Sequence, residues 1–459
     1  MVIAVVLILL VAGSLIFHFM SPWWFTPIAS NWTTMDQTVH ITFWVTGIVF
    51  VAVNLFMAYA VLRYRHRKGH RAHYEPENRK LEWWLVITTT LGVAAMLAPG
   101  LFVWARFVQV PHDASIVEAV GQQWHWSYRF PGEDGQLGAT SPRLVSNENP
   151  FGLDPKDPRG EDDVLVLNPE LHLPINRPVK ILLRSKDVLH NFTVAQFRVK
   201  MDLVPGMTTY MWFTPTKLGE YEILCEELCG IAHYAMRGRV TVDDEQTFKA
   251  WLARHPTFAA ASNREPADLT AGKALFAPCV ACHGESAGGN VTLNAPKLAG
   301  QGSWYLQRQL DNFKHGRRGA QNDTTGMLMV PFAGMLTDET AIRNVTSYIA
   351  TLPDHRPQAT VSGDATRGAS LYRTCAVCHG ESGQGIEAMN APRLSGMSDW
   401  YLARQLKNFK QGIRGSHHQD LYGKQMAMIS GVVPDAEISD LLAYINTLQP
   451  VEQRTAMTN

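Results

Sequence analysis

The stretch LCEELCGIAHYAMRG, residues 224–238, places two thiols, an imidazole and a thioether in one short loop, as Cys225, Cys229, His233 and Met236. Zinc takes cysteine and histidine ligands, whereas copper takes soft thiolate and thioether ligands together with imidazole. A redox dithiol normally has the spacing Cys-x-x-Cys beside a βαβ pattern, which is missing from this sequence. Of the three kinds of site, copper uses the most of these residues.

The doubled cysteine favours a pair of copper ions. A mononuclear blue copper site needs one cysteine, two histidines and an axial methionine. Two thiolates can instead bridge two ions, each of which is capped by one histidine. The second histidine must come from another segment, and His190, in DVLHNFTV before a predicted strand, is the natural candidate. The alternative for His190 is a buried, hydrogen-bonded core histidine, which the neighbouring cysteine motif disfavours.

The other four of the six cysteines occur in two pentapeptides, CVACH and CAVCH. Cys-x-x-Cys-His is typical of covalent attachment of a c-type haem, in which the histidine ligates the iron. The predicted attachment and ligand residues are Cys279, Cys282, His283, Cys375, Cys378 and His379. Every cysteine is then assigned to metal or haem, and since haem c is attached outside the cytoplasm, these domains must be exported.

The two pentapeptides belong to a longer internal repeat. NAPKL begins at residue 294 and NAPRL at 390, and WYLQRQLDNFKHGRRG at 304 returns as WYLARQLKNFKQGIRG at 400. The distance along the chain between the two copies, from residue 294 to residue 390, is longer than the repeat unit of solenoid proteins. The sequence therefore predicts two copies of one small helical haem module. The apolar residues of the WYL segments have helical spacing, which predicts a core helix with its lysines and arginines in solvent.

An axial methionine is expected on the far side of each haem, where it raises the reduction potential. Met329 and Met426 occupy matching places in the two copies once a slip of one residue is allowed, with Met327 and Met428 as the near alternatives. Methionine is also a common core residue, but the recurrence favours ligands. A bis-histidine haem would need a second recurring histidine, which the repeat lacks.

Three apolar stretches at the start of the chain, residues 2–20, 41–62 and 84–107, are each about one membrane thickness long. The loop 63–80 is dense in arginine and lysine, which places it in the cytoplasm and everything after residue 108 outside. The first stretch lacks the basic segment and the small-x-small cleavage site of a signal peptide. We therefore favour a retained span over a cleaved signal.

Between the spans and the haem repeat, residues 115–245 contain β-branched and aromatic runs separated by proline and glycine turns, which indicate a β-sandwich or barrel. Residues 131–163 read as a long acidic surface loop. Its carboxylates could bind calcium, but a solvated loop is the favoured interpretation. The acidic residues concerned are Asp154, Asp157, Glu161, Asp162 and Asp163. The formal net charge of zero argues against a nucleic-acid partner.

These motifs carry a family resemblance. CEELCGIAHYAM matches the Cys-x-Glu-x-Cys-Gly-x-x-His-x-x-Met signature of subunit II of haem-copper cytochrome c oxidases. The similarity extends through DVLHNFTV, VPGM, QQWHWSYRFP and EPENRKLEWW, and it covers essentially residues 20–245. The repeat resembles tandem dihaem cytochromes c, and oxidases with a cytochrome c fused to subunit II are a known class.

The resemblance implies a binuclear CuA site on a cupredoxin-like β-sandwich. Its bridging ligands would be the thiolates of Cys225 and Cys229, and its terminal ligands the imidazoles of His190 and His233. The Met236 thioether and the Glu227 backbone carbonyl would be weak axial ligands. The resemblance also implies a magnesium ion, shared with subunit I, at the Glu227 side chain. Trp124 matches the aromatic residue through which electrons reach the copper, and Glu82 matches an acidic residue near a proton channel of subunit I.

The predicted fold is multidomain. Its parts are transmembrane helices in residues 1–110, a periplasmic cupredoxin-like CuA domain in 111–250, a linker in 251–266, and all-α cytochrome c domains in 267–353 and 361–450. Two features depart from the family pattern, namely the additional N-terminal span and the acidic insertion before Asp163. Neither departure involves a predicted ligand.

The predicted function is that of the subunit that receives electrons for a proton-pumping terminal oxidase in a bacterial inner membrane. Electrons would pass from a soluble periplasmic donor through two haems to CuA, and on to subunit I, which reduces oxygen to water. Both haems are predicted to be six-coordinate, so no catalytic residue is expected in this chain. The alternatives are the corresponding subunit of a CuA-containing nitric oxide reductase and a free-standing membrane cytochrome that only shuttles electrons.

Overall fold

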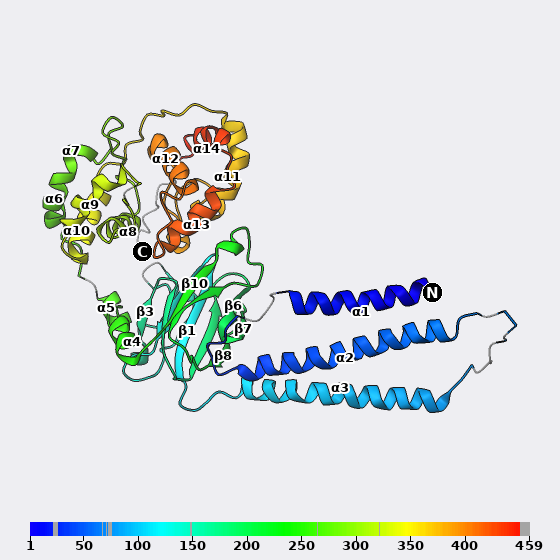
Figure 1. Cartoon of the computed structure of the whole chain (residues 1–459). Helices are drawn as coiled ribbons and strands as arrows, with labels where there is room; N and C mark the ends of the chain where they lie inside the picture. The colour runs from blue at the N-terminus through cyan, green and yellow to red at the C-terminus, as the bar shows by residue number, and fades with distance from the viewer. Residues whose placement is uncertain are drawn as a thin grey trace.

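The structure is a computed structural model that describes residues 1–449 except 22–25, 67, 70, 72–75, 147–148, 264 and 321. Figure 1 shows three parts in chain order: long helices that project to one side, a β domain, and two helical modules above the β domain. This confirms the predicted order of apolar helices, β-sandwich and helical haem region.

The first part consists of α1 (Val2–Met20), α2 (Thr33–Arg63) and α3 (Arg79–Val108). Each is long and apolar enough to cross a membrane by length and composition, and its side chains are mostly exposed in the described chain. Apolar residues exposed over such lengths are expected to face lipid. The Asn78 side chain caps the start of α3 by accepting a hydrogen bond from the Leu81 backbone.

The foot of α2 is anchored to the β domain. Trp32 is buried and donates from its indole nitrogen to the Trp212 carbonyl at 3.0 Å. One turn further, Asp36 forms an ion pair with Arg198 at 2.6 Å. These contacts attach the β domain to the N-terminal end of α2.

The β domain is a sandwich of two five-stranded sheets, with strand orders β3-β2-β1-β5-β8 and β4-β10-β9-β6-β7. The strands are β1 (Ser115–Gln122), β2 (His125–Phe130), β3 (Val164–Val166), β4 (Glu170–Pro174), β5 (Val179–Ser185), β6 (His190–Val194), β7 (Val199–Leu203), β8 (Thr209–Phe213), β9 (Gly219–Leu224) and β10 (Arg237–Asp243). In β5 burial alternates along the strand, as expected when one face of a sheet packs on a core. The core between the sheets is rich in aromatic residues, such as Trp126, Phe192 and Phe213.

One acidic residue of the predicted surface loop is not solvated. Asp163 is completely buried, and its carboxylate lies 2.5 Å from the guanidinium of Arg129. Arg129 also pairs with buried Glu118, which in turn accepts from Arg184. The expectation of a solvated loop was therefore wrong for Asp163, because a buried guanidinium needs carboxylate partners.

The segment after β10 is helical and partly packed on the β domain. It contains α4 (Glu245–Leu252) and α5 (Phe258–Ser262), and Phe258 is buried in a small cluster with Phe151. The predicted linker 251–266 thus includes a turn of helix that contacts the sandwich.

Two similar helical modules follow. The first contains α6 (Leu269–Phe276), α7 (Val280–His283), α8 (Ser303–Lys314), α9 (Met329–Gly334) and α10 (Glu339–Ala350). The second contains α11 (Ala365–His379), α12 (Asp399–Lys410), α13 (Leu421–Ser430) and α14 (Ile438–Ile445). Figure 1 places the second module over the β domain, with α13 close to the strands.

Candidate copper and haem centres

The loop between β9 and β10 carries the cysteine motif. Cys225 directly follows β9, and its backbone nitrogen donates to the Met236 carbonyl at 3.3 Å, which closes the loop just before β10 begins. His190 is the first residue of β6, which pairs with β9 through Thr193 and Leu224. Neighbouring strands of one sheet therefore bring the histidine to the base of the loop.

The predicted copper ligands form one cluster. The sulfur atoms of Cys225 and Cys229 lie 3.7 Å apart, and His190 Nδ1 is 4.0 Å from Cys225 Sγ. On the other side, Cys229 Sγ lies 3.5 Å from His233 Nδ1 and 3.8 Å from Met236 Sδ. The ligand atoms of His190, Cys225 and Cys229 all lie within 4.8 Å of one another, and all three residues are buried.

The Glu227 backbone carbonyl also reaches the cluster, because its oxygen lies 3.2 Å from Cys225 Sγ. The Glu227 side chain is half-buried, and the next residue, Leu228, is 78% exposed. The backbone of residue 227 thus faces the thiols, while the loop around it borders solvent.

The protonation of the two thiols favours a bound cation. A hydrogen bond with the Cys229 thiol lowers the pKa of Cys225, and His190 acts in the same direction. The same hydrogen bond, together with burial, raises the pKa of Cys229. The two neighbouring thiols therefore oppose each other's ionisation, and positive ions between the sulfurs would stabilise both thiolates. Soft sulfur and imidazole donors in this number fit copper.

A second layer of hydrogen bonds orients the site. Asp187 Oδ1 lies 2.8 Å from His190 Nε2, which turns the other ring nitrogen toward Cys225. Asp187 also accepts from the Gln123 backbone at 2.7 Å. A carboxylate behind a metal-binding imidazole is the usual way to fix its tautomer and orientation.

Trp124 lies directly against this loop. Its indole nitrogen donates to the Cys229 carbonyl at 3.2 Å, and only 5% of the residue is exposed. Glu82, by contrast, lies in the first turn of α3 at the far end of the membrane helices, where it is exposed. The structure therefore brings Trp124 to the predicted copper ligands, whereas Glu82 is on α3, one of the long helices that project from the β domain in Figure 1.

Each haem module presents its histidine in the same way. His283 Nδ1 lies 2.8 Å from the Pro296 carbonyl, and His379 Nδ1 lies 2.7 Å from the Pro392 carbonyl. Because a carbonyl only accepts, Nδ1 carries the proton and the Nε2 lone pair is free for iron. Burial lowers the pKa of both histidines, so both rings are neutral.

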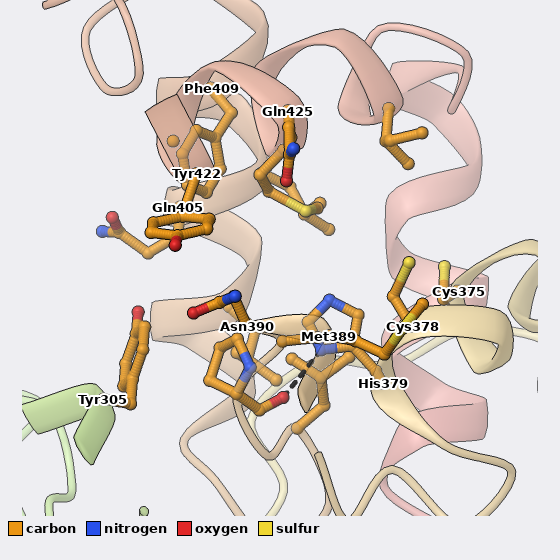
Figure 2. Close-up of a pocket in the computed structure, with 18 of the residues that line it drawn as sticks. Tyr305, Cys375, Cys378, His379, Met389, Asn390, Gln405, Phe409, Tyr422 and Gln425 are labelled. Atoms are coloured by element: carbon orange, nitrogen blue, oxygen red, sulfur yellow. Dashed lines mark hydrogen bonds between the residues drawn. The ribbon is translucent and has the colours of Figure 1, made fainter. Parts of the chain in front are cut away.

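The second module contains a large cavity beside this histidine. Figure 2 shows His379, Cys375 and Cys378 on one side of it and Gln425 across from them. Met426 lines the same cavity. The alternative axial residue Met428 lines a separate hollow against the β domain. Met389 and Met397 also line this cavity but have no methionine counterpart in the first module.

In the first module, Met329 is half-buried at the start of α9, and Met327, the alternative, is 44% exposed. The structure therefore places Met329 deeper than Met327.

The sequence did not reveal a pair of buried arginines between the modules. Arg318 and Arg414 are both buried, and they donate to the amide oxygens of Gln309 and Gln405. Neither arginine forms an ion pair with any described residue. Two buried cations that share neutral acceptors call for an anion, and haem propionates supply such charges. The recurrence of an arginine after each WYL segment was the available signal.

The expected solvation of the WYL segments was wrong for their arginines. Arg308 stacks on the Tyr422 ring of the second module at 4.4 Å and donates to Asn390 at 2.7 Å. Arg404 forms the matching bond to Asn294 of the first module at 2.7 Å. These residues hold the modules together because the apolar stripe of each helix already covers its own core.

Comparison with known proteins agrees with this arrangement. The family model for the periplasmic domain of cytochrome c oxidase subunit II matches residues 115–242, and the cytochrome c model matches residues 269–353 and 365–449. The alternative cytochrome c oxidase subunit 2 of Bradyrhizobium diazoefficiens is 58% identical over 264 residues, which cover 58% of this chain and 95% of that protein. The chain belongs to the cytochrome c oxidase subunit 2 family.

Two further relatives resemble the haem region. Cytochrome c4 of Azotobacter vinelandii is 30% identical over 192 residues, covering 39% of this chain and 89% of that protein. A crystal structure of reduced cytochrome c4 from Pseudomonas stutzeri is 27% identical and covers 40% of this chain and all of that chain, with a TM-score of 0.33.

The chain is thus a subunit 2 of cytochrome c oxidase with fused cytochrome c domains, and it transfers electrons to the oxidase. Its family implies a CuA site in the β domain and haem c in the modules. It is a membrane protein with N-terminal spans and a periplasmic β domain, and it is a partner of subunit I of a haem-copper oxidase.

Proposed function

We propose that this subunit receives electrons for a proton-pumping terminal oxidase of a bacterial inner membrane. Electrons would pass from a soluble periplasmic donor through two c-type haems to a binuclear CuA centre, and then to subunit I, which reduces oxygen to water. The observation that carries the proposal is the buried pair of sulfurs 3.7 Å apart, each with its own imidazole: His190 lies 4.0 Å from Cys225 Sγ, and His233 lies 3.5 Å from Cys229 Sγ.

The loop would hold copper with the ligands that the sequence predicts. In this proposal Cys225 and Cys229 would bridge the ions, His190 and His233 would cap them, and Met236 and the Glu227 carbonyl would bind weakly. When bound, the copper pair supplies a one-electron relay. The surrounding chain excludes water and keeps the ligand geometry fixed, which lowers the rearrangement that accompanies each electron transfer.

The modules would attach haem through two pairs of cysteines and bind iron through histidine and methionine. The assigned residues are Cys279, Cys282, His283 and Met329 in the first module and Cys375, Cys378, His379 and Met426 in the second. Both irons would then be six-coordinate, so oxygen chemistry belongs to the partner subunit.

Two further roles are proposed at the contact with subunit I. The Glu227 side chain would reach a shared magnesium ion, because the loop on which it lies borders solvent beside exposed Leu228. Glu82 would lie near the mouth of a proton channel at the cytoplasmic end of α3. The basic loop between α2 and α3 supports this orientation, with the copper and haem domains on the periplasmic side.

Metal and haem analysis of the purified oxidase tests the proposal. We expect two copper ions and two covalent haems for each copy of this subunit, beyond the metals of subunit I. We also expect oxygen uptake with a reduced cytochrome as the donor. Zinc in place of copper in this subunit would refute the copper assignment, and uptake of nitric oxide without oxygen uptake would reassign the terminal acceptor.

A further inference from the structure

Helix α13 of the second module is bonded directly to the residue that faces the copper loop. Gln425 Nε2 donates to the Trp124 backbone oxygen at 2.6 Å, and the two residues are 301 positions apart in the sequence. Trp124 in turn donates from its ring to the Cys229 carbonyl at 3.2 Å. A single chain of hydrogen bonds therefore joins the residue before Met426 to a predicted copper ligand.

The contact continues on both sides of Gln425. Tyr422, one turn earlier, donates from its hydroxyl to the Leu167 carbonyl at 3.2 Å, and its ring lies 5.3 Å from that of His125. At the edge, Arg239 of β10 donates to the His418 carbonyl at 3.0 Å. Tyr422 and Gln425 of α13, and His418 just before the helix, thus hold this part of the module to the sandwich through bonds to backbone oxygens.

Apolar residues of the haem cavity complete this interface. Cys378, Met389 and Ile429 pack against the core of the β domain. In addition, the cavity that contains His379 is lined by Trp124 together with Ile231, Ala232 and Ala235 of the copper loop. The wall of the second haem cavity is therefore formed partly by the copper domain itself.

The first module, unlike the second, lies away from the contact between α13 and the β domain. Figure 1 shows α6, α7, α9 and α10 beside the second module and farther from α13 and the strands. Its described link to the interface passes through Arg308, which stacks on Tyr422. The order along the molecule is consequently first module, second module, copper domain.

We propose that the second cytochrome module is docked over Trp124 in the resting protein, with Gln425 as the positioning residue, so that this module alone delivers electrons to the copper loop. This rests on the proposed function. A soluble donor protein is then excluded from Trp124 and must deliver electrons through the haem modules. The contact would carry one electron at a time from the second haem to the copper pair. The haem iron goes from ferrous to ferric, and the copper pair gains that electron. No bond is made or broken, and the reductant is a one-electron donor protein.

The physical character of the interface gives a first test. Its bonds run to backbone carbonyls and its packing is apolar, so the docking should withstand high salt, unlike an encounter steered by surface charges. Hydroxyl-radical labelling of the intact oxidase, read by mass spectrometry, should find Trp124 protected at low and at high ionic strength. Labelling of Trp124 as fast as that of exposed Met207 would overturn the proposal.

A variant pair tests the role of Gln425. Gln425→Glu loses the donor and places a carboxylate against the Trp124 carbonyl, while Gln419→Glu makes the same charge change at an exposed position of the same module. Loss of one buried hydrogen bond should raise the labelling of Trp124 about tenfold. Q419E should match the wild type. Gln425→Ala removes the donor without adding charge and replaces Q425E if that variant does not assemble.

Anaerobic mixing with ferrous cytochrome c provides the second measurement. In Q425E the haems should be reduced at the wild-type rate, while the near-infrared copper band should respond about tenfold more slowly. Equal labelling and equal copper reduction in wild type, Q425E and Q419E would overturn the docking role. That outcome leaves the proposed function intact, whereas absence of a copper band in the wild type would refute the proposed function itself.

Discussion

Arg318 of the first module and Arg414 of the second share the same pair of hydrogen-bond acceptors. Each donates to the side-chain oxygens of Gln309 and Gln405, at 2.9 or 3.1 Å. Arg318 also donates to the Tyr401 hydroxyl of the other module at 2.7 Å. The two modules are therefore related by a reciprocal contact in which two buried guanidinium groups form no ion pair with any described residue.

The first prediction follows from that buried charge. Arg318→Gln should lower the reduction potential of the haems, because a nearby cation stabilises the reduced, more negative form of a haem with its propionates. It should also cost about 1–3 kcal/mol of stability. Arg317→Gln is the matched control, since Arg317 pairs with Asp311 at the surface. Spectroelectrochemical titration that gives wild-type potentials for R318Q would contradict a propionate site here.

The second prediction concerns the carboxylate behind His190. Asp187→Asn keeps the shape of the side chain but loses the negative charge 2.8 Å from the ring. Outer partners of this kind typically contribute 10–100-fold to metal affinity, so we expect about that loss of copper affinity. Chelator titration followed by the near-infrared copper band measures it. Glu226→Gln, beside Cys225 but in a surface pair with Lys200, should bind copper normally.

The copper loop could be predicted from the sequence because most of its ligand residues lie in one short loop between two strands. Only His190 had to be brought from elsewhere, and its place at the start of a strand was visible in the pattern. Likewise the Cys-x-x-Cys-His motifs are contiguous. The structure adds the distances that bring Cys225, Cys229 and His190 together.

The contacts between domains could not be predicted in the same way. Gln425 and Trp124 are 301 positions apart, and neither belongs to a local pattern that names the other. The burial of Asp163 could not be predicted for the same reason, because its partner Arg129 lies on a strand that precedes the whole acidic segment. Pairings of this kind depend on how separate elements pack, and composition reports only that the residues are polar.

The third prediction separates the two candidate axial methionines of the second module. Met426 lines the cavity of His379, whereas Met428 lines the hollow against the β domain. Met426→His should lower the potential of one haem and leave the other nearly unchanged, because a thioether ligand raises the potential relative to imidazole. Met428→Leu should leave both potentials as they are. A lowered potential in M428L with none in M426H would reverse the assignment.

The fourth prediction is a pH dependence of the β domain that arises at Glu118. Burial raises the pKa of this carboxyl, but the guanidinium groups of Arg129 and Arg184 outweigh burial and hold it below its ordinary value. A carboxyl with a lowered folded pKa contributes stability that is complete above the unfolded pKa and is lost as the pH falls through the folded one. The stabilisation from Glu118 should therefore be full at neutral pH and disappear in acid.

Glu118→Gln tests this directly. At neutral pH it should destabilise the β domain by about 3–5 kcal/mol, since it breaks a buried pair and leaves Arg184 without its carboxylate. The difference from the wild type should shrink as the pH falls below the ordinary carboxyl range, because the wild type then loses the same charge. Urea unfolding followed by loss of the copper band measures both quantities. Glu222→Gln removes a surface partner of Arg237 and should change stability little at any pH, so an equal effect of the two substitutions would place the acid sensitivity elsewhere.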